Sequence, residues 1–321
     1  MVVSHSYMIG GFPGAPSVSS GSLGLGYFSV ACFFTISGYL ISQSRLNSSV
    51  KSFLWKRALR IIPGYLIAYF LTSFLFSPIV GLIKGGWTFR DSIDYLVGGI
   101  SFFKFGPQTI GETLTGLPHP ENWNGSLWSV RVEALLYVAT ASVFLMSKLV
   151  LVKTLQLSVL LSSTIASILF GVGVLEDPSP AGILFTLCLF VPFYLAGSLV
   201  FLERQRIRLN TYTVTTMFVL ATVFLSIPGF AAASAVPMAI VCLAVGSIQL
   251  PSTLAHFKRN DYSYGVYVLS FPIQQCLAVL GAGLLGVGWF IVMSLIFSLI
   301  FAILSWHLVE AQFLKLKNVV R

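Results

Sequence analysis

Charged residues are scarce in this chain: aspartate, glutamate, lysine and arginine together make up 9% of its 321 residues. Soluble domains carry roughly a quarter charged residues, which cover the surface that faces water. Hydrophobic residues make up 56% of the chain, and the mean hydropathy is +0.89. One water-soluble core cannot bury that much apolar surface. The composition therefore excludes a soluble globular protein and predicts an all-α fold, a polytopic membrane helical bundle.

Cysteine is also rare, and no two cysteines have the spacing of a metal site or lie in loops. All four fall inside predicted membrane spans: Cys32, Cys188, Cys242 and Cys276. We therefore expect neither a disulfide framework nor a metal site, because buried thiols most often serve as small hydrophobic side chains. The formal net charge is +9, but no RNA-binding or DNA-binding motif accompanies it, so nucleic acid is not an expected partner.

Apolar stretches of about 20 residues, the length that crosses a bilayer, recur along the whole chain. They are Leu23–Ser44, Leu59–Leu82, Ser126–Ser147, Leu151–Gly173, Ala181–Leu202, Thr211–Pro228, Ala231–Leu250, Tyr262–Gly281 and Gly288–Val309. Met1–Met8 is too short to cross and is expected to end a further, truncated helix, which gives about ten transmembrane helices. Only one loop is long, the outer loop at about residues 83–125. The chain is therefore predicted to be a single integral membrane domain, 1–321.

Basic residues are distributed unevenly between the two sides of the predicted bundle. Of the 19 lysines and arginines, 15 fall on one side when the C-terminus is placed inside; the outer loops hold Lys84, Arg90 and Lys104, and Arg131 lies within a span. This excess follows the positive-inside rule. We expect a multi-pass protein of the inner (plasma) membrane with a cytoplasmic C-terminus. Tyr95–Phe105 has about half the length of a span and is expected to be an interfacial or re-entrant piece of the outer loop.

Polar side chains at membrane depth are the candidates for function, because a charged one costs roughly 2.5 to 3.5 kcal/mol on insertion scales. His5 lies near the outer end of the first, truncated helix. Imidazole is the side chain best suited to take a proton from a hydroxyl group near neutral pH. His5 is therefore a candidate general base, with an ordinary interfacial histidine as the alternative.

Ser37 and Gly38 lie in the middle of a predicted span, in the stretch FFTISGYLIS. Small residues there leave a polar gap that a thin ligand or a neighbouring helix can approach closely. Both interpretations, a ligand and close helix packing, stay open.

Arg57 and Arg60 lie at the inner mouth of the next span, in the stretch KRALRIIP. They are three residues apart and therefore share one helical face. Two planar guanidinium groups on one face suit a ligand that carries phosphate groups. Positive-inside anchoring is the alternative.

Arg131 and Glu133 lie within the stretch WNGSLWSVRVEALLY, one to two turns below Trp128 at the outer interface. Residues two apart point to different sides of a helix, so each needs a partner on another helix. Glu133 has Tyr137 on its own face, and His5 is its predicted partner: a carboxylate bound to the imidazole fixes the tautomer and raises its basicity. A structural bridge between Arg131 and a carboxylate is the alternative.

The stretch YSYGVYVLSFPIQQ supplies three further polar side chains, Tyr264, Tyr267 and Gln274, which are expected to line a cavity. Near the inner end of the last span, His307 and Glu310 are expected to anchor the helix instead.

The motifs occur in the order His5, FFTISGYL, KRALRIIP, NGSLWSVRVEALLY, YSYGVYVLSFP and VEAQF, and the whole set resembles the acyltransferase 3 family, integral membrane O-acyltransferases of surface glycans. The resemblance implies that His5 is the essential first-helix histidine, that Arg57 and Arg60 handle the acyl-CoA donor, and that Glu133 is the family's glutamate. The NGSLW form looks most like members that acetylate exopolysaccharide, O-antigen or nodulation-type oligosaccharides. The chain departs from the family where Ser270 replaces a common histidine.

The predicted function is transfer of an acetyl or other short acyl group from cytoplasmic acyl-CoA to a glycan hydroxyl on the outer side. Acyl-CoA is a co-substrate, no cofactor is expected to stay bound, and the bilayer and the glycan are the other partners. The candidate residues are catalytic His5 and Glu133; acyl-CoA-binding Arg57, Arg60, Ser37 and Gly38; and substrate-binding or oxyanion-stabilising Arg131, Trp128, Asn124, Tyr137 and Tyr267. The alternative is a secondary transporter or glycan flippase, in which Arg131 and Glu133 bind a moving substrate.

Overall fold

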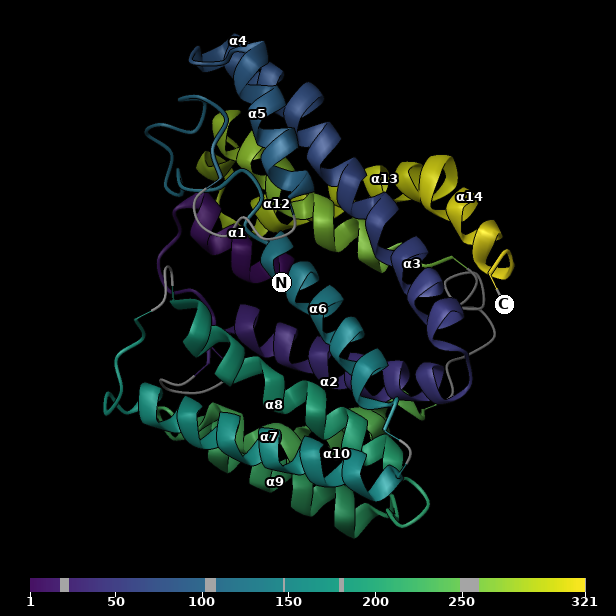
Figure 1. Ribbon diagram of the computed structural model, residues 1–321. Helices are drawn as coiled ribbons and strands as arrows, with labels where there is room; N and C mark the ends of the chain where they lie inside the picture. The colour runs from purple at the N-terminus through teal and green to yellow at the C-terminus, as the bar shows by residue number, and fades with distance from the viewer. Residues whose placement is uncertain (18–22, 102–107, 147, 179–181, 249–259, 321) are drawn as a thin grey trace. The chain divides into compact units, whose positions relative to one another are not determined.

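The computed structural model describes residues 1–17, 23–101, 108–146, 148–178, 182–248 and 260–320 (Figure 1). Within these ranges the regular structure is helical, and the pairing of extended chain is limited to two isolated bridges, Ser17–Gly24 and Gln108–Asn122. Residue contacts divide the chain into two compact units. Unit 1 comprises Met1–Ala15, Trp55–Leu135 and Pro251–Arg321, and unit 2 comprises Pro16–Leu54 and Leu136–Leu250. The expectation of a single domain stays a prediction.

Each predicted span coincides with a helix, and the short first helix is present as well. The main helices are α1 Val2–Gly10, α2 Leu25–Leu46, α3 Val50–Leu71, α4 Ser77–Lys84, α5 Phe89–Ile100, α6 Leu127–Val143, α7 Leu149–Gly171, α8 Ile183–Leu202, α9 Thr211–Ser226, α10 Ala235–Gly246, α12 Ser263–Val279, α13 Val287–Ser305 and α14 Ala311–Leu314. The all-α class is therefore confirmed for the described residues.

Five of the described helical segments are long and apolar enough to cross a membrane, so the number of about ten spans is not confirmed. They are Leu25–Leu46, Val50–Lys84, Leu149–Gly171, Ile183–Leu202 and Val287–Asn318. Two further apolar helices, Thr211–Ser226 and Ala231–Gly246, are shorter. Several predicted features lie outside the described residues: Lys104, Lys258, Arg259 and Arg321 of the charge count, residues 102–105 of the predicted interfacial piece, and the span ends Ser147, Ala181 and Leu250.

The second span is longer than hydropathy predicts. Its helix begins at Val50 rather than Leu59 and continues through a π-helical turn at Thr72–Phe76 to Lys84. The predicted start is late because Lys51, Lys56, Arg57 and Arg60 lower the hydropathy of the first turns, although straight-chain basic residues are good helix formers.

Unit 1 is organised around α12, which packs against α13 and α1. Pro272 has no backbone N–H and therefore cannot bond to the carbonyl of Val268, four residues earlier. Asn124, just before α6, donates its amide to that carbonyl at 2.7 Å, and its own carbonyl oxygen accepts from the hydroxyl of Ser126. The hydrogen bond that Pro272 cannot make in α12 is thus replaced by one from Asn124, in the segment just before α6.

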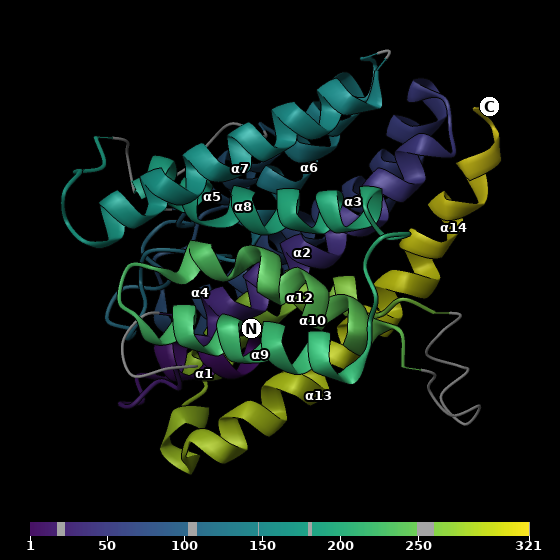
Figure 2. The same cartoon turned by 90° about the horizontal axis from the view of Figure 1, so that it is seen from below.

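Unit 2 is a bundle of α2, α7, α8, α9 and α10, whose ribbons α7 to α10 run side by side (Figure 2). Its tightest contact is the crossing of α2 and α8. A Cβ atom added to Gly38 would lie 1.9 Å from the carbonyl oxygen of Tyr194, and one added to Gly197 would lie 2.0 Å from that of Thr35. Two glycines facing each other's backbone allow the helices to touch, as in membrane packing based on small residues.

Candidate active site

Helix α12 presents one face, and several of the predicted site residues of unit 1 lie on it or against it. Tyr264, Tyr267, Phe271 and Gln274 are three or four residues apart, so they share this face along nearly three turns. From Tyr264 to Phe271 the helix rises about 10 Å. The face therefore has two ends, and different partners gather at each.

His5 lies at the Phe271 end. Its ring meets the ring of Phe271 edge-on, with centroids 4.9 Å apart and an interplanar angle of 71°. The side-chain amide of Gln274 holds α1 in place by donating to the carbonyl of Val2 at 2.9 Å and to the hydroxyl of Ser6 at 2.8 Å. Among the described residues the buried Nδ1 of His5 has no hydrogen-bond partner. A fixed imidazole with one unused nitrogen fits a general base.

His119 is a second histidine at this end, and the sequence motifs did not identify it. Its ring meets the ring of Phe271 edge-on, with centroids 5.7 Å apart. His5 and His119, which are far apart in the sequence, therefore contact the same aromatic side chain. Burial lowers the pKa of His119, so the loop histidine favours its neutral form. The amide of Gln275 fixes the segment by donating to the carbonyls of His119 and Asn122. The only sequence signal was a histidine in the long outer loop.

Arg131, on α6, is 3% exposed and is bound by tyrosines of α3. Its Nε donates to the hydroxyl of Tyr65 at 3.0 Å, and its Nη2 donates to the hydroxyl of Tyr69. Tyr65 in turn donates to the carbonyl of Gly99 on α5 at 2.9 Å. Tyr65 and Tyr69 thus bind Arg131 through hydroxyl groups, which carry no charge of their own.

Glu133 lies on the same helix and is 5% exposed. Its carboxylate is within electrostatic range of the hydroxyls of Tyr264 and Tyr267 on α12. The hydroxyl of Tyr267 hydrogen-bonds to that of Ser129, one turn before Glu133. Glu133 therefore lies near the turns of α12 that carry Tyr264 and Tyr267, whereas His5 lies against Phe271. Their direct pairing stays a prediction.

Arg60 lies at the Tyr264 end of the face. It forms an ion pair with Asp261, and its guanidinium lies over the ring of Tyr264 at 5.2 Å from the centroid. Within the described part of the chain, Nη1 of Arg60 and Nε of Arg57 are buried and lack hydrogen-bond partners. Guanidinium nitrogens with unused donors suit an anionic ligand.

Glu310 also belongs to this end, although the sequence suggested only an anchor for the last helix. It is 2% exposed, and one carboxylate oxygen accepts from the hydroxyl of Ser305 at 2.7 Å. A Cβ atom added to Gly64 would lie 2.5 Å from the Tyr264 ring and 3.3 Å from the Glu310 carboxyl carbon. Gly64 thus allows α3, α12 and the last helix to meet around Tyr264.

Ser37, Gly38 and Tyr137 belong to unit 2, and the other predicted site residues belong to unit 1. The space beside Gly38 is filled by the backbone of α8, which accounts for this glycine by close helix packing, the alternative given above. Ser37 is buried, and the buried Tyr137 ring meets Phe53 edge-on at 6.4 Å. Their predicted roles toward substrate stay predictions.

Asn124 and Trp128 lie at the start of α6 in unit 1. Asn124 is 3% exposed and holds the Val268 carbonyl, as described above. Trp128 is half-buried in the first turn. The hydrogen bonds of Asn124 to Val268 and Ser126 give this residue a structural role just before α6. The contact of Asn124 with substrate stays a prediction.

Comparisons with known proteins agree with the sequence motifs. The profile of an acyltransferase domain matches residues 1–307. The chain is 28% identical over 332 aligned positions to an O-acetyl transferase of Shigella phage Sf6, covering 98% of this chain and 92% of that protein. It is 25% identical over 317 positions to Nodulation protein 10 of Rhizobium leguminosarum bv. viciae, covering 90% and 82%.

No solved structure matches the chain. The profile covers nearly the whole sequence, and in the part of the chain that the structure describes five helical segments have the length and apolarity of membrane spans. The chain belongs to the acyltransferase 3 family, as a multi-pass membrane acyltransferase.

Proposed function

We propose that the protein is an O-acyltransferase that moves an acetyl or other short acyl group from cytoplasmic acyl-CoA to a hydroxyl of a cell-surface or lipid-linked glycan. The single observation that carries the proposal is the α12 face, which has a cluster of arginine and acidic side chains at Tyr264 and two histidines at Phe271. The name of one relative, an O-acetyl transferase, supports this class of reaction.

The donor end of the proposed site is the Arg60 end. Arg57 and Arg60 bind phosphate groups of acyl-CoA through their unused guanidinium donors. Asp261 keeps Arg60 extended along the Tyr264 ring. The arm of acyl-CoA that carries the acyl group then extends along α12, so that its thioester lies near Phe271, about 10 Å of helix rise from Tyr264.

His5 performs the proton transfer. One imidazole nitrogen takes the proton of a sugar hydroxyl as the sugar oxygen bonds to the thioester carbonyl carbon. The negative charge on the carbonyl oxygen is stabilised by Arg131 or a nearby donor. The C–S bond then breaks, and the proton passes from the imidazolium to the coenzyme A thiolate. Glu133 lies near Tyr264 and Tyr267 and orients the tyrosine hydroxyls of α12 between the two ends of the site.

The test uses membranes that contain the protein, radiolabelled acetyl-CoA and surface polysaccharide from which ester groups have been removed by mild alkali. We expect covalent label on the polysaccharide. His5→Ala should lower the rate by about 10² to 10⁴, the usual contribution of a general base, while the protein stays inserted. His307→Gln is the matched control, since His307 lies on the last helix beside Tyr262 and not against Phe271. Uptake of glycan without covalent label would support the transporter alternative and overturn the proposal.

A further inference from the structure

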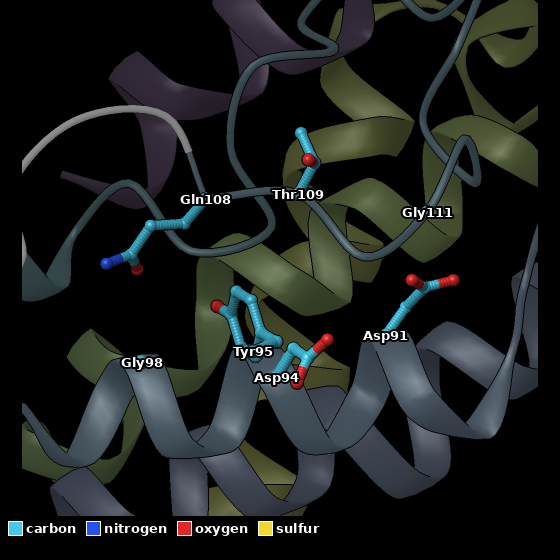
Figure 3. Close-up of a pocket in the computed structure, with 7 residues that line it drawn as sticks. All are labelled: Asp91, Asp94, Tyr95, Gly98, Gln108, Thr109 and Gly111. Carbon is cyan, nitrogen blue, oxygen red and sulfur yellow. The ribbon is translucent and has the colours of Figure 1, made fainter.

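The outer loop and α5 line a pocket of about 350 Å³ within unit 1. Figure 3 shows Asp91, Asp94 and Tyr95 rising from α5 toward the loop, and the side chain of Gln108 reaching from the loop toward α5. Thr109 and two glycines complete the lining. The pocket is therefore built from hydroxyl, amide and carboxylate groups around one aromatic ring.

Tyr95 is the feature of the pocket that points to a ligand. The residue is 6% exposed, and its hydroxyl is buried without a hydrogen-bond partner in the described structure. A buried hydroxyl left unpaired costs free energy, yet a phenylalanine would fill the same position without that cost. Its ring is held by Tyr69, with centroids 5.1 Å apart. A fixed, unused hydroxyl in a polar pocket suits a ligand that supplies the missing partner.

The charges of the pocket select the kind of ligand. Carboxylates accept hydrogen bonds but do not donate, so Asp91 and Asp94 suit hydroxyl groups and repel anions such as phosphate. Asp91 also accepts from the Thr88 hydroxyl at 2.7 Å, and Asp94 lies 3.9 Å from Arg90. Among the described residues no three side chains of the metal-ligating types gather as a metal site would require. A neutral polyhydroxylated ligand fits these groups best.

The pocket connects to the buried arginine of the proposed active site. The Gln108 side-chain oxygen accepts from the hydroxyl of Tyr69 at 2.8 Å, and the same hydroxyl accepts from Arg131. One tyrosine therefore touches both a pocket residue and the candidate oxyanion-stabilising residue. An occupant that contacts Gln108 is therefore linked to Arg131 through two hydrogen-bonded side chains, Gln108 and Tyr69.

We propose that this pocket, with Asp94, Tyr95 and Gln108 as its ligand-binding groups, is a subsite for sugar units of the glycan acceptor. The inference rests on the proposed function for the identity of the glycan as acceptor. The pocket lies in the loop predicted to face outward, where a surface glycan is present, so it binds sugar units beside the one that reacts and sets how the acceptor chain lies.

The test compares Tyr95→Phe and Asp94→Asn with the control Glu121→Gln, which changes an exposed carboxylate of the same loop outside the pocket. The acceptor probe is the alkali-treated surface polysaccharide, cut to oligosaccharides. We expect the acceptor KM to rise about three- to tenfold in Tyr95→Phe and about tenfold or more in Asp94→Asn, with the acyl-CoA KM unchanged and no change in the control. The melting temperature of Tyr95→Phe should not fall, because the lost hydroxyl has no protein partner.

A binding experiment separates this inference from the proposed function. Saturation-transfer NMR of the same oligosaccharides with purified protein, without acyl-CoA, should give contacts that weaken in both pocket variants. Binding that weakens in the variants while the wild type transfers no acyl group would refute the proposed function and support the subsite. An acceptor KM equal to that of the wild type in both variants would overturn the subsite. So would an effect of Asp94→Asn on this KM that depends on the concentration of added Ca²⁺.

Discussion

The contact of α2 with α8 gives a prediction that separates the two interpretations of Gly38. In Gly38→Ala the new methyl group lies 1.9 Å from the Tyr194 carbonyl oxygen, about 1.5 Å closer than an ordinary van der Waals contact. The atom it meets is backbone, so no side-chain rotation relieves the overlap and one helix must move. We expect a loss of about 3 kcal/mol in the free energy of unfolding, the upper part of the range for overpacked cores.

The matched control for this prediction is Gly246→Ala at the end of α10. A Cβ atom there meets nothing within 4 Å, so the substitution should leave stability unchanged or raise it by about 0.5–1 kcal/mol through helix propensity. Unfolding of purified protein in detergent, followed by tryptophan fluorescence, measures both. If Gly38→Ala keeps wild-type stability and instead raises the KM for acyl-CoA, the packing explanation is wrong and the ligand explanation holds.

Three further predictions concern unit 1. Arg60→Gln should raise the acyl-CoA KM about tenfold or more, whereas Asp261→Asn, which removes the partner but keeps the guanidinium, should raise it less; equal effects in kinetics would contradict the donor site. Asn124→Ala should lower the free energy of unfolding by about 1–3 kcal/mol, because the Val268 carbonyl loses its donor. Burial lowers the pKa of His119, so the unfolded state binds the extra proton, and stability should fall as pH drops below about 6.5. His119→Gln should weaken that pH dependence in melting experiments between pH 5 and 8, and an unchanged profile would show that another group causes it.

The sequence predicted which ionisable residues are buried at membrane depth, but not which residues they contact. Arg131 and Glu133 are conspicuous because ionisable groups in apolar stretches are costly, and both are indeed buried. Their partners were not predictable. Arg131 binds Tyr65 and Tyr69, which lie 66 and 62 positions earlier, and tyrosines in an apolar helix carry no mark of such a role.

Hydropathy and helical periodicity alone determined that this is an all-α, multi-pass membrane protein, because both are properties of residues close together in the chain. Tertiary structure decided which of the polar residues meet. It placed His119 beside His5 on Phe271, joined Arg60 to Asp261 across 201 positions, and filled the space beside Gly38 with backbone. These outcomes depend on how helices distant in sequence pack against one another, and a pattern within one helix specifies its polar face but not the helix that face will meet.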